Sequence, residues 1–165
     1  VRRGAPDARL IVDANEAWGA LDVEAKATAL VPYHVELIEQ PVPAGQDHLL
    51  DGVKSPIPLC ADETIHDRAT LAAAIGRYRF INIKLDKTGG LTEALALAHE
   101  ACQHGLQLMT GCMLSTSLGV APAFVVGMQS QFIDLDGPLL LAQDRDHAIR
   151  YDGSLMHPPS AALWG

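Results

Sequence analysis

Residues 80–90, which read Phe-Ile-Asn-Ile-Lys-Leu-Asp-Lys-Thr-Gly-Gly, decide the fold. Apolar residues alternate with polar ones over 81–85, and this period of two predicts a β-strand. The glycine pair separates that strand from an amphipathic helix predicted over 92–104. A strand followed directly by a helix is typical of a βα unit, in which the helix covers the apolar face. We therefore expect Lys84 to point to the other side, into whatever the sheet encloses.

Five more apolar stretches predict strands, and most are followed by a helical pattern. The strands are expected at 10–15, 35–41, 58–63, 106–112 and 132–136, and the helices at 21–30, 46–53, 68–75 and 117–128. Strands that alternate with helices, with no hairpins between them, predict a parallel sheet with helices outside it. Beyond the last strand, Asp152-Gly153 predicts a type I′ hairpin.

Local signals set the limits and faces of several helices. Asp67 is a good N-cap for the helix at 68–75, and Gly105 is a good residue to end the helix at 92–104. The apolar stripes expected from helical spacing are Leu21, Ala25, Thr28 and Ala29 in the first helix and Ala94, Leu97, Ala98 and Ala101 in the fourth.

The length of the chain limits how many βα units it holds. An eight-unit barrel takes about 250 residues, so 165 residues correspond to about six units. The predicted fold class is α/β, a partial (β/α) TIM-type barrel of about six βα units. Six of eight units leave two missing, and we expect these upstream of Val1.

Composition excludes several classes of partner. The net charge is -8, with 12 Lys and Arg against 20 Asp and Glu, so nucleic acid and anionic membranes are not expected as partners. No apolar run approaches the roughly 20 residues of a membrane span, and the amino end of the sequence lacks the charged-then-apolar layout of a signal peptide. The cysteines (Cys60, Cys102 and Cys112) are odd in number and widely spaced, which favours free thiols and the cytoplasm. A small molecule is the expected partner.

Charged residues recur where the predicted strands end. Asp13, Glu39 and Asp62 end three consecutive strands, and Lys84 ends the fourth. Three neighbouring carboxylates repel one another unless a cation lies among them, and oxygen ligands suit Mg²⁺ or Mn²⁺. Alternatively, each acid caps the helix after its strand. Capping is not possible for Glu39, because the chain continues into Gln40 and Pro41 rather than into a helix. The pattern therefore favours a metal site.

Asp134 and Asp136 share one face of the sixth strand by the period of two. Such a pair could bind a metal in a sugar-nucleotide transferase, hold an ammonium group, or lie in solvent at the end of a strand. A transferase also needs a nucleotide site, and the Thr-Gly-Gly at 88–90 is too short for a phosphate loop. Zinc at His99, Cys102 and His104 is disfavoured, because the second Cys/His pair of such sites is missing.

Taken together, the motifs carry a family resemblance over essentially the whole chain. They are Val-Asp-Ala-Asn at 12–15, Ile-Glu-Gln-Pro at 38–41, Cys-Ala-Asp-Glu-Thr at 60–64, Asn-Ile-Lys-Leu-Asp-Lys-Thr-Gly-Gly at 82–90, and Asp-x-Asp at 134–136. The chain resembles the carboxyl-terminal barrel of the enolase superfamily, and within it the dipeptide epimerases of the L-Ala-D/L-Glu type. The segment at 109–114 is similar to the seventh-strand segment of that family.

The resemblance implies a site and a reaction. The residues it assigns are Asp13, Glu39 and Asp62 to Mg²⁺, Lys84 to acid/base catalysis, Asp134 and Asp136 to the substrate ammonium, and Cys112 and Leu114 to the substrate's surroundings. The implied reaction is 1,1-proton transfer on a dipeptide through an enediolate, in the metabolism of cell-wall peptides. A lysine in this role is expected to have its pKa lowered to about 7–8.

The sequence departs from the family pattern at one catalytic motif, and this departure leaves several hypotheses open. The family has Lys-x-Lys at the end of its second barrel strand, and none of the lysines here stands in such a motif. We expect the amino-terminal capping domain and first barrel strands to be absent from residues 1–165, and these residues alone to be inactive. The alternatives are a cycloisomerase or acid-sugar dehydratase of the superfamily, or an inactive barrel fragment that acts in assembly. The open edges of an incomplete sheet can pair with another chain, so a homo-oligomer is one possible assembly.

Overall fold

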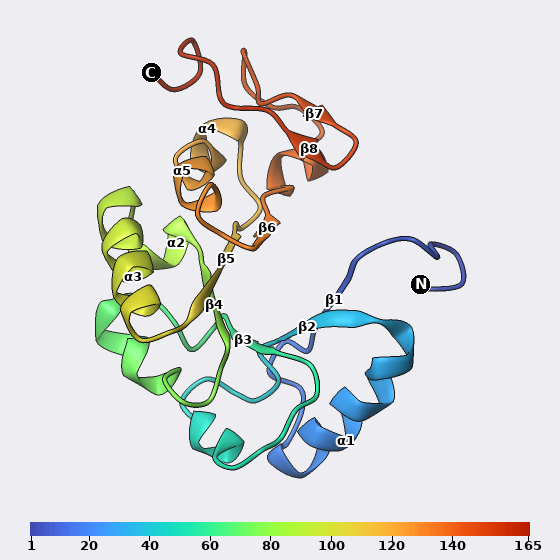
Figure 1. Ribbon diagram of the computed structural model, residues 1–165. Helices are drawn as coiled ribbons and strands as arrows, with labels where there is room; N and C mark the ends of the chain where they lie inside the picture. Colours follow the sequence, from blue (N-terminus) through green and yellow to red (C-terminus); the bar gives the residue numbers. More distant parts are fainter.

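The structure is a computed structural model that describes residues 1–165, apart from the side chains of Ala20 and Leu21. Six parallel strands pair in the order β1-β2-β3-β4-β5-β6, so the predicted parallel sheet is confirmed. The strands are β1 (Leu10–Asp13), β2 (Val35–Glu39), β3 (Leu59–Ala61), β4 (Phe80–Ile83), β5 (Gln107–Gly111) and β6 (Phe132–Asp134). Figure 1 shows the sheet curling, with the helices on its outer side, which confirms a partial barrel.

The connections are short helices. They are α1 (Ala20–Leu30), α2 (Leu85–Thr88), α3 (Leu91–Gln103), α4 (Ser117–Val120) and α5 (Ala123–Gly127), with 3-10 helices at Val31–Tyr33, Asp47–Leu50, Arg68–Ala73 and Gly137–Leu140. The hairpin of β7 (Tyr151–Asp152) and β8 (Leu155–Met156) follows.

The two faces of the sheet bury different sets of side chains. On the outer face, Ile81 and Ile83 pack in the large core with the buried stripe of α3, which is the stripe expected from the sequence. On the inner face, Phe80 belongs to a small separate cluster and meets the Phe132 ring edge-on, with centroids 5.2 Å apart. The Arg9 guanidinium, just before β1, lies 5.2 Å from the same Phe132 ring. Contact between residues at the two edge strands demonstrates how strongly the sheet curls.

The strand predicted over 81–85, which is β4, ends two residues earlier than the period of two predicts. β4 stops at Ile83, and the amides of Lys87 and Thr88 donate to the Lys84 carbonyl at 3.0 and 3.1 Å, which forms α2. Gly89 then ends α2 with a φ of 75°, in the left-handed region that favours glycine. Lys84 therefore caps a helical turn, and Lys87 follows one turn later on the same side.

Several further expectations need correction. The helix expected over 117–128 is broken into α4 and α5, because Pro122 has no N–H to donate. The hairpin exists, but its turn is Gly153-Ser154, and only Gly153 has the positive φ that type I′ requires at both central residues.

The stripe expected on the first helix is also wrong. Ala25, Thr28 and Ala29 are exposed, whereas Val23 and Ala27 are buried, because alanine spacing fits more than one face. Leu21 lies outside the described side chains. The helix expected at 68–75 is a 3-10 helix, with Asp67 as its confirmed N-cap.

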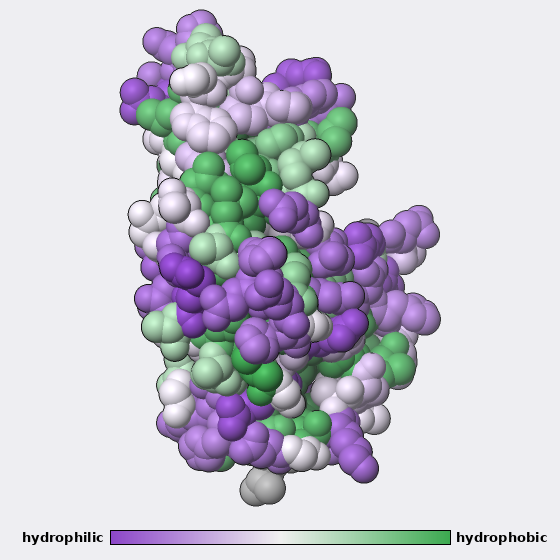
Figure 2. All heavy atoms as spheres, turned by 60° about the vertical axis from the view of Figure 1, so that its left-hand side comes forward, coloured by the Kyte–Doolittle hydropathy of each residue, from purple (hydrophilic) through white to green (hydrophobic). Residues whose placement is uncertain are grey.

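The outer surface is mainly hydrophilic on the side that carries the helices, with an apolar area in its upper half (Figure 2). None of the described helices has the length and hydropathy needed to cross a membrane. The cysteines Cys60, Cys102 and Cys112 are free, as predicted.

Candidate active site

The polar ends of the strands converge on the inner side of the sheet. Asp13 and Glu39 are direct partners in the register of β1 and β2, and Glu39 pairs with Cys60, two residues before Asp62. Parallel pairing thus puts three acids on neighbouring strands at the same end of the sheet. Glu39 and Asp62 are 5% and 3% exposed, so both acids are buried.

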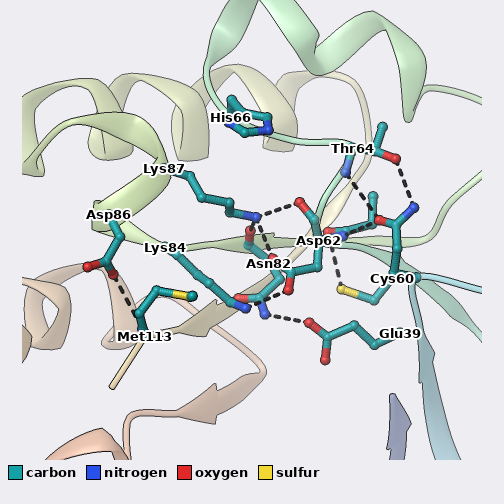
Figure 3. Close-up of polar contacts among 12 residues, drawn as sticks. Glu39, Cys60, Asp62, Thr64, His66, Asn82, Lys84, Asp86, Lys87 and Met113 are labelled. Carbon is teal, nitrogen blue, oxygen red and sulfur yellow. Dashed lines mark hydrogen bonds and ion pairs between the residues drawn. The ribbon is translucent and has the colours of Figure 1, made fainter. Parts of the chain in front are cut away.

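Two lysines compete for the Asp62 carboxylate (Figure 3). Lys84 Nζ donates to Asp62 Oδ2 at 2.5 Å, while Lys87 Nζ donates to Oδ1 and to the Asp62 carbonyl. Lys87 also donates to the Asn82 carbonyl at 3.1 Å, so its three protons all have acceptors. The side chains of Lys84 and Lys87 are only 16% and 14% exposed.

The charges of this cluster shift the pKa values of both lysines. Burial works to lower the pKa of Lys84, but the hydrogen bond and charge of Asp62 raise it above its ordinary value. This direction is opposite to the lowering expected from the sequence, because Asp62 pairs directly with the ammonium. For Lys87, burial outweighs the attraction of Asp62 and lowers the pKa.

Glu39 is held by Asn82, whose side-chain nitrogen donates to Oε1 at 2.6 Å (Figure 3). Burial raises the pKa of Glu39 to about 7, against the opposing effect of the Asn82 hydrogen bond, and the charges of Asp62 and Asp13 raise it further. Asn82 is itself buried, and its Oδ1 has no hydrogen-bond partner among the described residues. The cluster therefore combines an excess of buried carboxylate charge with an unpaired oxygen.

Asp13 is the most open of the three acids. Its carboxylate accepts from the Asn15 amide and from Asn15 Nδ2, both at 2.8 Å. Among the described residues, no three acidic, histidine or cysteine side chains stand close enough to form a ready-made metal site. The lysines occupy both oxygens of Asp62, and Asp13 is bonded to Asn15.

The donors nevertheless fit a small divalent cation. All three acids offer oxygen, which is what Mg²⁺ prefers. Burial is the main cause of the raised pKa of Glu39, and repulsion from Asp62 and Asp13 adds to it; a cation would offset both effects. A further buried oxygen, Glu63 Oε2, also lacks a partner beside the cluster.

The second group of predicted residues lies at the end of β5 and β6. Asp134 and Asp136 are exposed and line one cavity of about 280 Å³, together with apolar side chains that include Leu135, Tyr151 and Met156. Burial raises the pKa of Asp134, the charge of Asp136 raises it further, and Lys84 acts in the opposite direction. Asp134 therefore lies within the electrostatic influence of Lys84.

Cys112 and Leu114 follow β5. Burial raises the pKa of the Cys112 thiol, although it accepts a hydrogen bond from the Gly137 amide, and Asp134 and Asp136 add to the increase. The Cys112 thiol therefore lies within the electrostatic influence of the aspartate pair. Leu114 is 65% exposed, so nothing in the described chain covers it.

Several residues of the site were missed by reasoning from the sequence. Lys87 was hidden because the predicted strand ran past Lys84, which would have turned Lys87 outward. Asn82 faces inward by the same period of two as Lys84, and that signal could have found it. Gln40 and Glu63 each stand directly after a predicted metal ligand, which is a weak signal by itself.

A family model described as "Enolase C-terminal domain-like" matches residues 1–161. The chain is 48% identical over 165 residues to an N-acetyl-D-glutamate racemase of Pseudoalteromonas sp, covering 100% of this chain and 52% of the relative. It is 49% identical over 157 residues to the L-Ala-D/L-Glu epimerase of Escherichia coli (strain K12), covering 95% of this chain and 49% of the relative. The chain thus spans about half the length of these relatives.

A solved structure shares the same architecture. It is an enolase family member from Agrobacterium tumefaciens with homology to dipeptide epimerases, determined with bound sodium and L-Ala-L-Glu. The TM-score is 0.96 at 52% sequence identity, over 100% of this chain and 51% of the other.

Proposed function

The chain belongs to the enolase C-terminal domain-like family, and from this premise we propose that the complete protein epimerises dipeptides of the L-Ala-D/L-Glu type. The reaction moves a proton at the α-carbon of the carboxyl-terminal residue. Residues 1–165 would form the carboxyl-terminal part of the barrel domain. The three free cysteines support a reducing compartment, the cytoplasm.

One observation carries the proposal. The Lys84 ammonium lies on the inner side of the sheet, bonded to Asp62 at 2.5 Å and next to buried Glu39. If Asp62 bound a divalent cation in place of the Lys84 ammonium, Lys84 Nζ would be free to exchange a proton with a substrate carbon. A single lysine reaches one face of that carbon, so inversion needs a second acid/base group on the opposite face.

Asp13, Glu39 and Asp62 would hold Mg²⁺. When bound, the ion would stabilise the negative charge that develops on the substrate carboxylate as the α-proton leaves. Lys87 would keep Asp62 in place, because it holds the Asp62 carbonyl as well as Oδ1.

Asp134 and Asp136 would bind the free ammonium of the dipeptide. Two exposed carboxylates that line one cavity suit a cation at the amino end of the substrate. Cys112, beside them, and Leu114 would contact the rest of the substrate. An ammonium clamp is what separates this reaction from cycloisomerisation or acid-sugar dehydration.

A second candidate is racemisation of N-acylated amino acids, which the similarity to an N-acetyl-D-glutamate racemase favours. An N-acetyl substrate has no ammonium group for Asp134 and Asp136 to bind. The comparison of L-Ala-L-Glu with N-acetyl-glutamate therefore separates the two candidates.

The test is the double variant Asp134→Asn and Asp136→Asn in the protein at its full natural length. We expect KM for L-Ala-L-Glu to rise by tenfold or more, since each charge-assisted hydrogen bond contributes about 1.5–3 kcal/mol. KM for N-acetyl-glutamate should change little. Equal effects on the two substrates would contradict the clamp.

A further inference from the structure

Gln40 connects the ends of three strands that bear the acids of the site. The main-chain amide of Gln40 donates to the Cys60 carbonyl at 2.9 Å, and the main-chain carbonyl of Gln40 accepts from the Glu16 amide at 2.8 Å. Its side-chain oxygen accepts from the amides of Asp62 at 2.8 Å and Thr64 at 3.2 Å. One residue thus contacts the segments after β1 and β3 while it directly follows Glu39 in β2.

The orientation of the Gln40 side chain is fixed by its surroundings. Nε2 donates to the Val42 carbonyl at 2.8 Å and to Thr64 Oγ1 at 2.9 Å, so the nitrogen and oxygen ends of the amide face different partners. Gln40 is 0% exposed and has a φ of 33°, in the left-handed region that glutamine seldom adopts. A buried residue that keeps a strained backbone and satisfies every polar atom is held by its contacts.

Asp47 binds the side chains of Thr64 and Tyr78, both of which contact Gln40. Asp47 is buried and accepts from Thr64 Oγ1 at 2.6 Å and from the Tyr78 hydroxyl at 2.7 Å. The Tyr78 hydroxyl lies 3.4 Å from Gln40 Nε2, at the limit of a hydrogen bond. The network therefore runs from Asp47 through Thr64 to Gln40 and ends at the main chain of Asp62.

From this geometry we propose that Gln40 is the positioning residue of the acid cluster. It sets the spacing of Glu39 and Asp62 by joining the main chain that follows one to the main-chain amide of the other. It touches no carboxylate and no substrate. The inference rests on the proposed metal ligation, because metal affinity is the property that this spacing controls.

The test compares two variants that remove contacts from the same network. Gln40→Met keeps the length of the side chain but leaves the amides of Asp62 and Thr64 unpaired. Tyr78→Phe removes the bond to Asp47, which retains Thr64 and the Gly45 amide. It also removes the 3.4 Å contact with Gln40 Nε2, which keeps its two shorter bonds to Val42 and Thr64. Both variants lose stability, so a loss of stability alone does not distinguish them.

The readout is the affinity for Mn²⁺, followed by the electron paramagnetic resonance signal of the free ion, in the protein at its full natural length. Loss of an outer partner of a metal ligand lowers affinity by about 10–100-fold, which we expect for Gln40→Met. Tyr78→Phe should stay within about twofold of the wild type, because the amide of Asp62 keeps its acceptor. If Gln40→Met does not fold, Gln40→Asn serves, since asparagine tolerates a positive φ but is too short to reach Asp62.

The outcomes separate the two levels of the proposal. If the wild type binds Mn²⁺ and both Gln40 variants bind it as tightly as Tyr78→Phe, the positioning role is wrong and the metal site stands. If the wild type itself does not bind Mn²⁺, the proposed ligand set fails, and with it the role of Gln40. If the Gln40 variants bind Mn²⁺ more weakly than Tyr78→Phe and the wild type do, both the metal site and the positioning role are supported.

Discussion

Gly111 leaves the space in which the acid cluster is assembled. A Cβ at this position would lie 2.8 Å from both Asn82 Nδ2 and Asn82 Oδ1, and 3.0 Å from Lys84 Cε. Gly111 has no positive φ, so alanine meets no backbone strain there. The effect of Gly111→Ala should therefore come only from displaced side chains.

The magnitude follows from what has to move. Forcing an extra methyl group into a packed site costs about 1–3 kcal/mol. If Asn82 withdraws, the 2.6 Å hydrogen bond to buried Glu39 is lost as well, which adds about 1.5–3 kcal/mol. We expect Gly111→Ala to lower the free energy of unfolding by about 1–3 kcal/mol if Asn82 keeps this bond, and by about 2.5–6 kcal/mol if the bond is lost. A shift of Lys84 by about 1 Å should also lower kcat by about a hundredfold.

Gly127→Ala is the matched control. A Cβ there would meet Ile133 and Leu135 side chains at 3.7 Å, which is ordinary contact. Its stability should be unchanged or higher by up to about 1 kcal/mol, because alanine restricts the unfolded chain. Urea unfolding and steady-state kinetics of the two variants, at full natural length, provide the comparison. Equal unfolding midpoints and equal kcat for Gly111→Ala and Gly127→Ala would refute this reasoning.

Two more variants test the acid cluster and the carboxyl-terminal segment. Glu39→Gln keeps the shape of the side chain but removes its charge, so isothermal titration with Mg²⁺ should lose its signal; an unchanged affinity would exclude Glu39 as a ligand. Burial works to raise the pKa of Asp144, but hydrogen bonds from Ser117 and Arg145 outweigh it and lower the pKa below the ordinary value of about 3.9. The stability from ionised Asp144 is therefore present above about pH 4 and lost as the pH falls through the folded-state pKa. The Ile149 amide donates to Ser117 Oγ, so its protection factor against hydrogen exchange should fall on acidification in the wild type and change less with pH in Asp144→Asn.

The sequence was informative wherever one period or one unit repeats. The alternation around Lys84 predicted which side chains face inward, and the βα repeat predicted that Glu39 and Asp62 lie on neighbouring strands. These features depend on local geometry, which a single chain displays directly.

Features that depend on distant contacts could not be predicted in the same way. Gln40 acquires its role from Asp62 and Thr64, which lie 22 and 24 residues away in the sequence. The turn into α2 was missed because the residues after Ile83 fit a strand and a helix equally well over so short a stretch. Without that turn, Lys87 could not be assigned to the site.

Proton exchange at the substrate α-carbon tests the central claim most directly. The protein at its full natural length, with Mg²⁺ and L-Ala-L-Glu in D₂O, should form L-Ala-D-Glu that carries deuterium at the α-carbon of glutamate. Chiral chromatography with mass spectrometry measures both changes. We predict that Lys84→Met forms no L-Ala-D-Glu. Interconversion of the two epimers by Lys84→Met at the wild-type rate, or no α-deuterium in the wild-type product, would contradict the account.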